Sequence, residues 1–435
     1  MRSTLSLSLS LSLSLSLSLW LCLLAPPFVA WAQGAPRASE PTGPLTLGAA
    51  LELALATNPD LAAAGRELEA VDATIVQART RPNPELSTLI EDTLGVTQTT
   101  TIQLNQPIEL GGKRAARIEA AERGRDGASL ELDAKRAEIR AAVVAGFFEV
   151  LVAQERLRLA QVSGDLAQRA TGAAARRVKA GKVSPVEETK AQVAEASVRV
   201  EATLAASELA TARKRLAATW GNPAPRFERA QGDPQALPPL PDLAELNARL
   251  AASPNLQRAR IEVERRQALA EVERRRRIPD VTLSLGVKRD GEFDDTQAIF
   301  GVSIPLPIFD RNQGNLLEAL RRTDKARDEL SAAEIRLSTE LAAAFERLNA
   351  ARQETELLQR DILPGAQSAF DAATKGFELG KFGFLDVLDA QRTLLQAKSQ
   401  SLRALAEAHR SAAEIDRLLG EASPRTTSAP ATRAP

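Results

Sequence analysis

The feature that most constrains the fold of this chain is an internal duplication. The segment GKVSPVEETKAQ, residues 181–192, has a counterpart in GKFGFLDVLDAQ, residues 380–391, which lies 199 positions later. Shorter pairs recur at a similar spacing, namely Asn58-Pro59 with Ser253-Pro254, Gln106-Pro107 with Ile304-Pro305, and Phe148-Glu149 with Phe345-Glu346. Such self-similarity predicts two copies of one structural unit. Any fold proposed for this chain must therefore be built twice.

The duplication divides the 435 residues into segments. Residues 1–32 resemble an export signal, because Arg2 precedes an apolar run and the sequence Ala-Trp-Ala before Gln33 resembles a signal-peptidase site. A retained membrane anchor is the alternative for an apolar run of this length. The other predicted segments are an N-terminal extension (33–44), a first structural repeat (45–221), a proline-rich linker (222–242), a second structural repeat (243–420) and a disordered Ser/Thr/Ala/Pro tail (421–435).

Each repeat is predicted to contain a β-hairpin. Two helices, interrupted at Pro59 or Pro254, precede the hairpin and end before Pro82 or Pro279. In the second repeat, apolar residues alternate with polar or small ones at Val281, Leu283, Leu285, Val287, Ala298, Phe300, Val302 and Ile304. The first repeat shows the same alternation more weakly. A period of two predicts strands with one apolar and one polar face, and hence four strands per chain.

A very long helix is predicted after each hairpin. Residues 113–180 and residues 313–363 contain no proline. At 1.5 Å per residue the first helix would reach about 100 Å. Apolar residues recur at intervals of seven, which is typical of coiled-coil seams; they are Val143, Val150 and Leu157 in one helix, and Leu330, Leu337, Ala344, Ala351 and Leu358 in the other. The fold class is therefore mainly α with a small β part.

The duplicated segment is predicted to be the tip of a helical hairpin. Ser184-Pro185-Val186-Glu187 has the pattern of a capping box with proline at the first helical position. One helix would then end near Gly181, and its antiparallel partner would start near Pro185.

Composition argues against several functional classes. Lys plus Arg and Asp plus Glu both number 56, so no basic field is present to recruit nucleic acid. The four arginines 274–277 end a predicted helix, where they complement its dipole and are placed to meet lipid head groups. His409 and Met1 are the only residues of their types, and the single cysteine, Cys22, lies in the predicted signal. We therefore expect no catalytic residue, no metal site and no cofactor.

The four strands need partners from other chains. An open sheet with one apolar face would aggregate, whereas an exported chain with alternating hairpins suits an outer-membrane barrel. Three copies giving twelve strands form the smallest symmetric barrel that opens a lumen. Helices of about 100 Å do not fit a bilayer core of ~30 Å, so they are expected to project into the periplasm.

Two motifs carry a family resemblance. QPIELGGKRAARIEAAE, residues 106–122, and IPLPIFDRNQGN, residues 304–315, resemble the TolC-type outer-membrane factors of tripartite efflux systems, in the branch that partners heavy-metal resistance-nodulation-division pumps. The resemblance covers residues 45–420. It implies a homotrimer with a twelve-stranded barrel in outer-membrane lipid and a twelve-helix periplasmic tunnel. It also implies docking to a periplasmic adaptor and an inner-membrane pump.

The function implied by this resemblance is an exit duct for heavy-metal cations, not an enzyme. The alternative from another class is a periplasmic coiled-coil scaffold or adaptor without a pore. Within the family, a TolC-like duct for drugs or other small molecules is the alternative.

The resemblance further assigns roles at the tips. The segment LDVLDA, residues 385–390, is similar to the TolC segment that places two acidic rings at the periplasmic entrance, so Asp386 and Asp389 are the expected gate carboxylates. Stabilisation of a helix N-terminus is the alternative role for them. Phe377 stands where TolC has a tyrosine that hydrogen-bonds between hairpins, so the contact that closes this channel must differ.

Docking and structural roles are expected at the turns. The resemblance implies adaptor docking at six tip residues, for which turn formation is the alternative; they are Gly181, Lys182, Ser184, Gly380, Lys381 and Gly383. At the strand-to-helix joins, Gly111, Gly112 and Asp310 are interpreted as structural, with Asp310 as a helix cap.

Overall fold

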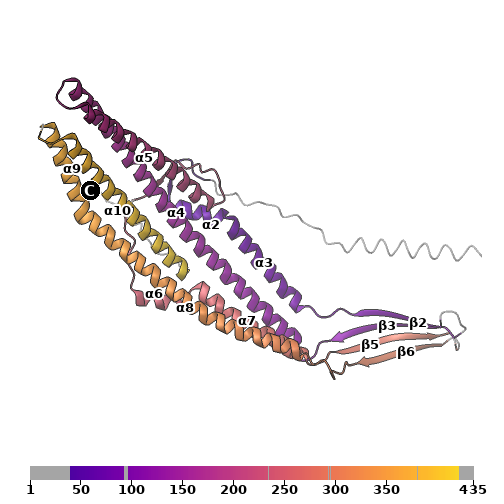
Figure 1. Cartoon of the computed structure of the whole chain (residues 1–435). Coiled ribbons are helices and arrows are strands. Elements are labelled where there is room, and N and C mark those ends of the chain that lie inside the picture. Colours follow the sequence, from indigo (N-terminus) through magenta and orange to yellow (C-terminus); the bar gives the residue numbers. More distant parts are fainter. Residues whose placement is uncertain are drawn as a thin grey trace, which may run out of the picture. The chain divides into compact units, whose positions relative to one another are not determined.

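One order of elements occurs twice along the chain (Figure 1). In the first copy the elements are α2 (Leu47–Thr57), α3 (Pro59–Arg79), β2 (Glu85–Glu91), β3 (Thr99–Ile108), α4 (Lys113–Lys179) and α5 (Pro185–Ala218). In the second they are α6 (Leu243–Leu250), α7 (Pro254–Arg276), β5 (Val281–Asp290), β6 (Asp295–Ser303), α8 (Gln313–Leu357), α9 (Leu363–Glu378) and α10 (Phe384–Leu419). The predicted hairpins and long helices are confirmed.

The structure is a computed structural model that describes residues 40–92, 97–233, 235–291, 293, 295–379 and 381–420. The predicted signal peptide (1–32), the predicted tail (421–435) and Gly380 lie outside the described residues. None of the described helices combines the length and the hydropathy of a membrane-crossing helix.

Proline and a capping side chain start the second helix of each copy. Pro59 is the first residue of α3, and the Asn58 side-chain oxygen accepts a hydrogen bond from the amide of Leu61 at 2.8 Å. Pro254 begins α7 in the same way, with Ser253 as its cap. Proline fits this position because its missing N–H has no helical partner there. The predicted interruptions at these prolines are therefore confirmed.

Four strands form one antiparallel sheet in the order β2-β3-β5-β6. Its register places Leu104 between Leu86 and Leu285, so that apolar side chains share one face. That face is exposed in the single chain; Leu86 is 70% and Leu285 is 60% exposed. On the other face, the Ser284 hydroxyl donates to Asn105 Oδ1 at 2.6 Å. The strands β2 and β6 are the two edges of this sheet.

A second, smaller sheet corrects the prediction of four strands. The segments β1 (Pro44–Thr46) and β4 (Arg229–Gln231) pair in parallel, one at the start of the first repeat and one within the proline-rich linker. Each contains only three residues, too few to show a period of two. Gln154 of α4 helps to hold β4, because its side chain bonds both the amide (2.7 Å) and the carbonyl (3.0 Å) of Ala230.

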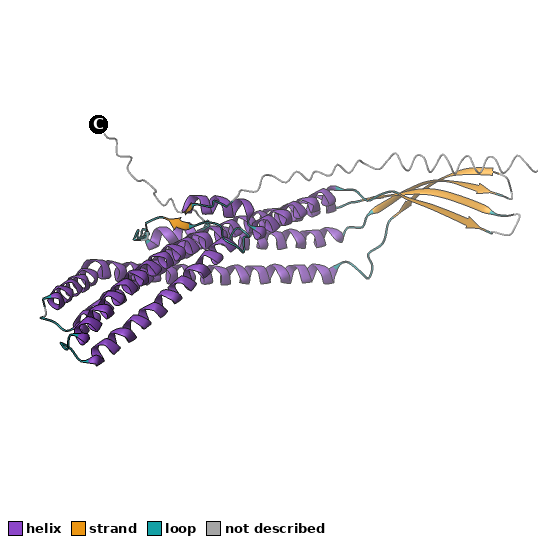
Figure 2. Ribbon diagram, turned by 90° about the horizontal axis from the view of Figure 1, so that it is seen from above, coloured by secondary structure: helices purple, strands orange, loops and turns teal. Residues whose placement is uncertain are grey.

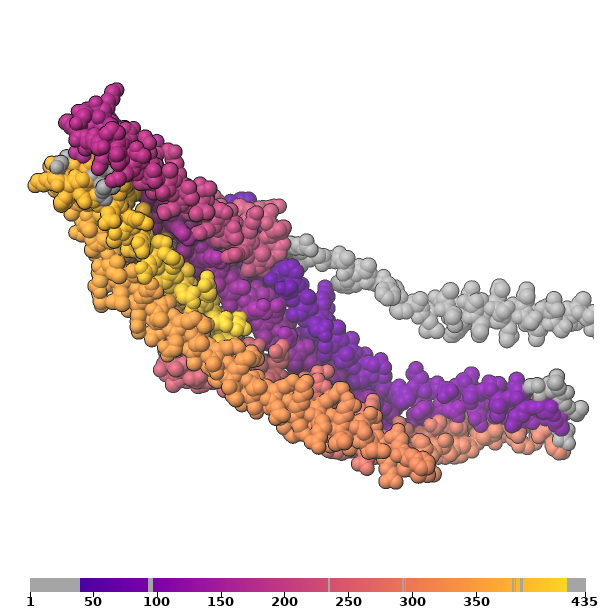
Figure 3. Space-filling model, in the orientation of Figure 1, coloured from indigo at the N-terminus to yellow at the C-terminus, as the bar shows by residue number. Residues whose placement is uncertain are grey.

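The long helices pack side by side around α4, which contacts α3, α5, α7 and α10. Figure 2 shows the large sheet continuing from one end of this helical bundle. In Figure 3, α10 (yellow) lies between the surface of α8 (orange) and the surfaces of α4 and α5 (magenta). Of the eight predicted seam residues, Val143, Val150, Leu337, Ala344, Ala351 and Leu358 are buried, whereas Leu157 and Leu330 are half-buried and pack against the buried clusters. Seams with a seven-residue interval therefore do hold the helices together.

The second long helix contains one irregular turn. After α8, residues Leu358–Ile362 form a π-helical turn, in which the amide of Leu363 donates to the carbonyl of Leu358, five residues earlier. Pro364 follows directly and is the second residue of α9. Because proline lacks an N–H and its ring crowds the carbonyl four residues before it, a regular α-helical turn is disfavoured at this point.

Candidate functional site: the two helical tips

At the first tip, a left-handed glycine ends α4. Gly181 has a φ of 67°, and its amide donates to the carbonyl of Val178 at 2.9 Å. The amide of Lys182 donates to the carbonyl of Arg177 at 3.0 Å. These two bonds form a Schellman motif, which satisfies carbonyls that the helix leaves without partners. Gly181 and Lys182 are both exposed.

Ser184 then starts α5, as predicted, with Pro185 at the first helical position. The detail of the cap differs from the predicted capping box. The Ser184 hydroxyl accepts from the amide of Val186 at 3.4 Å, whereas the amide of Glu187 donates to the Ser184 carbonyl at 2.9 Å. The side chain of Ser184 is exposed at the tip.

The second tip repeats this geometry. The amide of Lys381 donates to the carbonyl of Gly376 at 2.8 Å, the same backbone pairing that Lys182 makes in the first tip. Gly376 must be small, because a Cβ at this position would collide with the ring of Phe382. Lys381 and Gly383 are exposed. The two tips therefore share this backbone hydrogen bond between residues five positions apart.

The expected gate carboxylates lie on the first turns of α10. Asp386 accepts a hydrogen bond from the amide of Gly383 at 2.8 Å through Oδ2, so this carboxylate does cap its own helix. Asp389 lies one turn further on, and both side chains are exposed. Carboxylates at a helix N-terminus also gain from the helix dipole. Capping explains the position of Asp386 but not that of Asp389.

Phe377 connects the two helical hairpins. Its side chain packs in a small apolar cluster to which α4, α5, α9 and α10 all contribute, and whose members are Ala170, Ala174, Ala191, Phe377 and Leu388. The guanidinium carbon of Arg177 lies 4.4 Å from the centroid of the Phe377 ring. This is the geometry of a cation–π interaction. A phenylalanine side chain cannot make the hydrogen bond of the corresponding tyrosine. Apolar packing and a cation–π contact connect the hairpins at this position instead.

The strand-to-helix joins have the structural character that the sequence indicates. Gly111 and Gly112 have φ values of 71° and 72°, and a Cβ on Gly111 would collide with Ile278. The prediction that Asp310 caps the following helix is wrong. Asn312, in a left-handed conformation, occupies the cap position, and Asp310 Oδ1 accepts from the Asn312 amide at 2.8 Å. Asp310 therefore stabilises the turn before α8.

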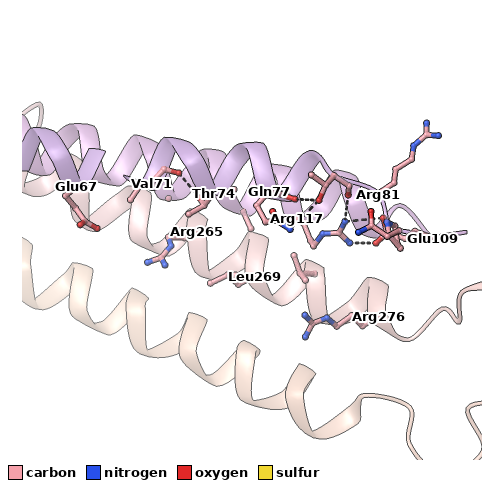
Figure 4. Close-up of a pocket in the computed structure, with 18 residues that line it drawn as sticks. Glu67, Val71, Thr74, Gln77, Arg81, Glu109, Arg117, Arg265, Leu269 and Arg276 are labelled. Carbon is pink, nitrogen blue, oxygen red and sulfur yellow. Dashed lines mark hydrogen bonds and ion pairs between the residues drawn. The ribbon is translucent and has the colours of Figure 1, made fainter. Parts of the chain in front are cut away.

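A groove near these joins is lined by α3, α4 and α7 (Figure 4). Within it, Arg117 donates to both carboxylate oxygens of Glu109, one of them at 3.1 Å, and this hydrogen bonding raises the pKa of Arg117 above its ordinary value. The charged side chains of the lining are Glu67, Arg81, Glu109, Arg117, Arg265 and Arg276. Arg265 and Arg276 pair with Glu262 and Glu273 of their own helix. We interpret this groove as a structural connection between sheet and helices.

Arginines of the run 274–277 also pair with glutamates of their own helix. Arg274 and Arg275 both contact Glu271, at 2.5 and 2.6 Å, and the hydrogen bond from Arg275 lowers the pKa of that carboxyl below its ordinary value. Three arginines of the run occupy the last turn of α7, as expected for a helix C-terminus.

No side chain in the described ranges marks a metal centre. Within them, no group of three or more His, Cys, Asp or Glu side chains is arranged to hold a metal ion. His409 of α10 is buried, and its ring stacks on Phe148 with ring centroids 3.3 Å apart. Its Nε2 lies 2.7 Å from the carbonyl oxygen of Ala236. His409 therefore packs α10 against α4 and the linker.

Comparison with known proteins agrees with this architecture. The family model described as "Outer membrane efflux protein" matches residues 50–222 and 246–421. Over 381 residues, the chain is 52% identical to the "Cobalt-zinc-cadmium resistance protein CzcC" of Cupriavidus metallidurans, covering 88% of this chain and 91% of that protein. It is 29% identical to the "Nickel-cobalt-cadmium resistance protein NccC" of Alcaligenes xylosoxydans xylosoxydans, covering 66% of this chain and 65% of that protein.

A solved structure of CusC shares the fold. It matches with a TM-score of 0.75 and 20% sequence identity, covering 92% of this chain and all (100%) of that chain. Because the match covers 92% of this chain, its fold is a known architecture. The family model matches most of both repeats, and CzcC is 52% identical over most of both chains. The chain therefore belongs to the outer membrane efflux protein family.

Proposed function

We propose that this protein is the outer-membrane exit duct of a tripartite system that exports heavy-metal cations. The observation that carries the proposal is the 52% identity, over 88% of the chain, to a protein named for cobalt, zinc and cadmium resistance. The tip turns, the strand-to-helix joins and the duplicated order of elements are compatible with this role. The relatives are efflux proteins, which supports transport over catalysis and a duct over the pore-free scaffold.

The free edges of the large sheet support assembly as a homotrimer. Each chain supplies four strands, and β2 and β6 leave the sheet open at both sides. Pairing β6 of one copy with β2 of the next would remove every edge, and three copies would close a barrel of twelve strands. The exposed apolar face, with Leu285 and Phe300, would then meet lipid, while the face with Asn105 and Ser284 would line the lumen.

In this proposal the tips form the periplasmic end of the duct. In a trimer, Asp386 and Asp389 would each occur three times around the entrance. Concentrated carboxylates in a narrow aqueous pore favour cations. The exposed tip residues Gly181, Lys182, Ser184, Lys381 and Gly383 would contact the periplasmic adaptor, which in turn connects the duct to the inner-membrane pump. The same role is proposed for Gly380.

Removing charge from the proposed gate tests it. Asp386→Ala with Asp389→Ala should shift the reversal potential in planar bilayers toward that of a non-selective pore and weaken block by divalent cations. Asp386→Asn with Asp389→Asn is the matched control for capping, because asparagine keeps an acceptor for the Gly383 amide without the charge. Both double variants should lose selectivity. If the asparagine variant keeps the selectivity of the original protein, the carboxylates act as caps and not as a gate.

Metal tolerance tests the proposed function itself. Deletion of the gene in its host should lower the concentrations of Co²⁺, Zn²⁺ or Cd²⁺ that permit growth, and the full chain supplied on a plasmid should restore them. An organic antimicrobial panel measured in the same strains distinguishes the alternative duct for drugs. Unchanged metal tolerance together with increased sensitivity to organic compounds would contradict the metal assignment.

A further inference from the structure

A second cavity lies where the two helical tips meet. Six of the described residues line it, namely Ala173, Arg176, Arg177, Ala180, Lys182 and Phe377. The first five come from the end of α4 and the turn after it, whereas Phe377 comes from α9 of the other hairpin. We call this cavity the tip-junction pocket. Because its lining comes from both hairpins, it exists only when they are packed together.

Positive charge dominates the described lining of the tip-junction pocket. Of the lining residues that the structure describes, three are basic and none is acidic. Elsewhere on the same hairpin, Arg156 pairs with Glu208 at 2.7 Å and Arg215 pairs with Glu149 at 3.1 Å. Within the described part of the chain, no such ion pair involves the bases of the pocket. Sequence reasoning singled out only Lys182 among them, although the run RRVKAGK, residues 176–182, has four bases and no acid.

The dipole of α4 is the simpler explanation for part of this charge, because cations are stabilised in the last turn of a helix. Arg176, Arg177 and Lys179 all lie in that turn. However, Lys182 lies beyond the end of the helix, and Lys179 shares the dipole but does not line the pocket. The two explanations can therefore be separated by comparing Lys179 with the residues of the pocket.

We propose that the tip-junction pocket accepts a carboxylate side chain from the helical end of the periplasmic adaptor, an inference that rests on the proposed function. The guanidinium carbon of Arg177 lies over the Phe377 ring, 4.4 Å from the ring centroid, and this contact restricts the positions that the guanidinium can take. A carboxylate can then accept charge-assisted hydrogen bonds from Arg177, Arg176 and Lys182. The apolar parts of the lining, Ala173, Ala180 and the Phe377 ring, suit the methylene groups of an aspartate or glutamate.

Binding in this pocket would also depend on how the two hairpins are packed against each other. A ligand that binds one arrangement better than another stabilises that arrangement by the difference in binding free energy. An adaptor carboxylate that contacts Arg177 while Phe377 forms the floor would favour the packed position of α9 against α4. Docking strength and the position of the tips are therefore linked.

Zero-length cross-linking tests the contact chemically. A water-soluble carbodiimide activates a carboxylate, a neighbouring lysine amine displaces the activated group, and an amide bond forms as urea leaves. Applied to intact host cells, this reagent should join Lys182, but not Lys179, to an aspartate or glutamate of an adaptor that also co-purifies with the unmodified chain. A link from Lys182 to Glu187, Asp386 or Asp389 of a second copy would overturn the proposal, as would equal linking of both lysines or no link.

Charge reversal gives an independent measurement. Purified adaptor should bind the full-length protein about tenfold more weakly after Arg176→Glu, while Lys179→Glu, a matched change in the same helical turn, should alter the affinity less than about twofold. Equal effects would leave only the helix dipole as the explanation. Metal tolerance of the unmodified strain is measured in parallel. If this strain is not metal-tolerant, the proposed function is refuted. If it is tolerant and the two variants have equal effects, only this inference is refuted.

Discussion

At the scale of single residues, the first strand-to-helix join depends on glycine for two independent reasons. Gly111 has a φ of 71°, and a Cβ placed on it would collide with Ile278 of the second repeat. Gly111→Ala should therefore lower the free energy of unfolding by more than about 1 kcal/mol. Gly164→Ala is the control, since nothing lies within 4 Å of a Cβ at this position inside α4.

Thermal unfolding in one detergent, followed by circular dichroism, checks both variants. Gly164→Ala should raise the midpoint slightly, because alanine is favoured over glycine inside a helix by about 0.5–1 kcal/mol. An unchanged midpoint for Gly111→Ala would show that the join relaxes without strain.

The same joins show how far single residues can be interpreted from sequence. The glycine pair was predictable because a sharp turn between a strand and a helix favours residues that tolerate positive φ. The cap of α8 was not, because Asp310 and Asn312 are both good caps and are separated by two residues. Asn312 occupies the cap position, and its side chain donates to the backbone carbonyl of Glu273 in α7 at 2.8 Å. That contact spans 39 positions of sequence.

At the scale of elements, the hairpins and seams followed from their periods, whereas contacts between elements did not. The seven-residue interval predicted six side chains that are buried along the long helices, although α4 buries many more than the two predicted there. The basic tip-junction pocket was missed because Phe377, which closes it, comes from a different helix than the arginines. The three-residue strands β1 and β4 were missed because they are held by Gln154 of α4 and by each other, not by any local pattern.

An ion pair within α10, on the side that faces α8, predicts a pH dependence. On α10, hydrogen bonding from Arg417 lowers the pKa of Glu414 below its ordinary value, and Arg417 also lies 3.9 Å from Glu340 of α8. A carboxyl whose pKa is lower in the folded state stabilises the protein above its unfolded pKa, and this contribution is lost as the pH falls through the folded value. Glu414→Gln should therefore lower stability at pH 7 and lose this effect in acid.

Thermal midpoints measured from pH 7 down to pH 3 give this comparison. Glu318→Gln is the control, because Glu318 and its partner Arg322 are 58% and 60% exposed, and exposed pairs contribute little. If Glu414→Gln shifts the midpoint by the same amount at every pH, packing and not ionisation is responsible.

At the scale of the whole molecule, neighbouring residues of one strand should respond in opposite ways. Leu104 is 48% exposed on the apolar face of the sheet, and Gln103 lies on the other face, where its side chain packs against Gly286. If the apolar face meets lipid, Leu104→Lys should cost about 2–4 kcal/mol near the middle of the bilayer, whereas a lysine facing the lumen is tolerated. Leu104→Lys should therefore deplete the assembled protein in outer membranes, and Gln103→Lys should not.

The yield of heat-sensitive oligomer in isolated outer membranes measures this difference. Equal yields of the two variants would contradict the assignment of the apolar face to lipid. Features of this kind are hard to predict from one sequence, because the edge strands of one chain pair with those of another chain.

The π-helical turn before Pro364 also records a difference in length between the two copies. Phe148 and Phe345 are 197 positions apart, but Gly181 and Gly380 are 199 apart, so the second copy holds two more residues along this stretch of helix. A π turn takes up an inserted residue without ending the helix around it. The irregular turn Leu358–Ile362 lies within this stretch, where it can absorb part of the insertion. The two copies can therefore differ in length while Lys182 and Lys381 make the same backbone pairing at their tips.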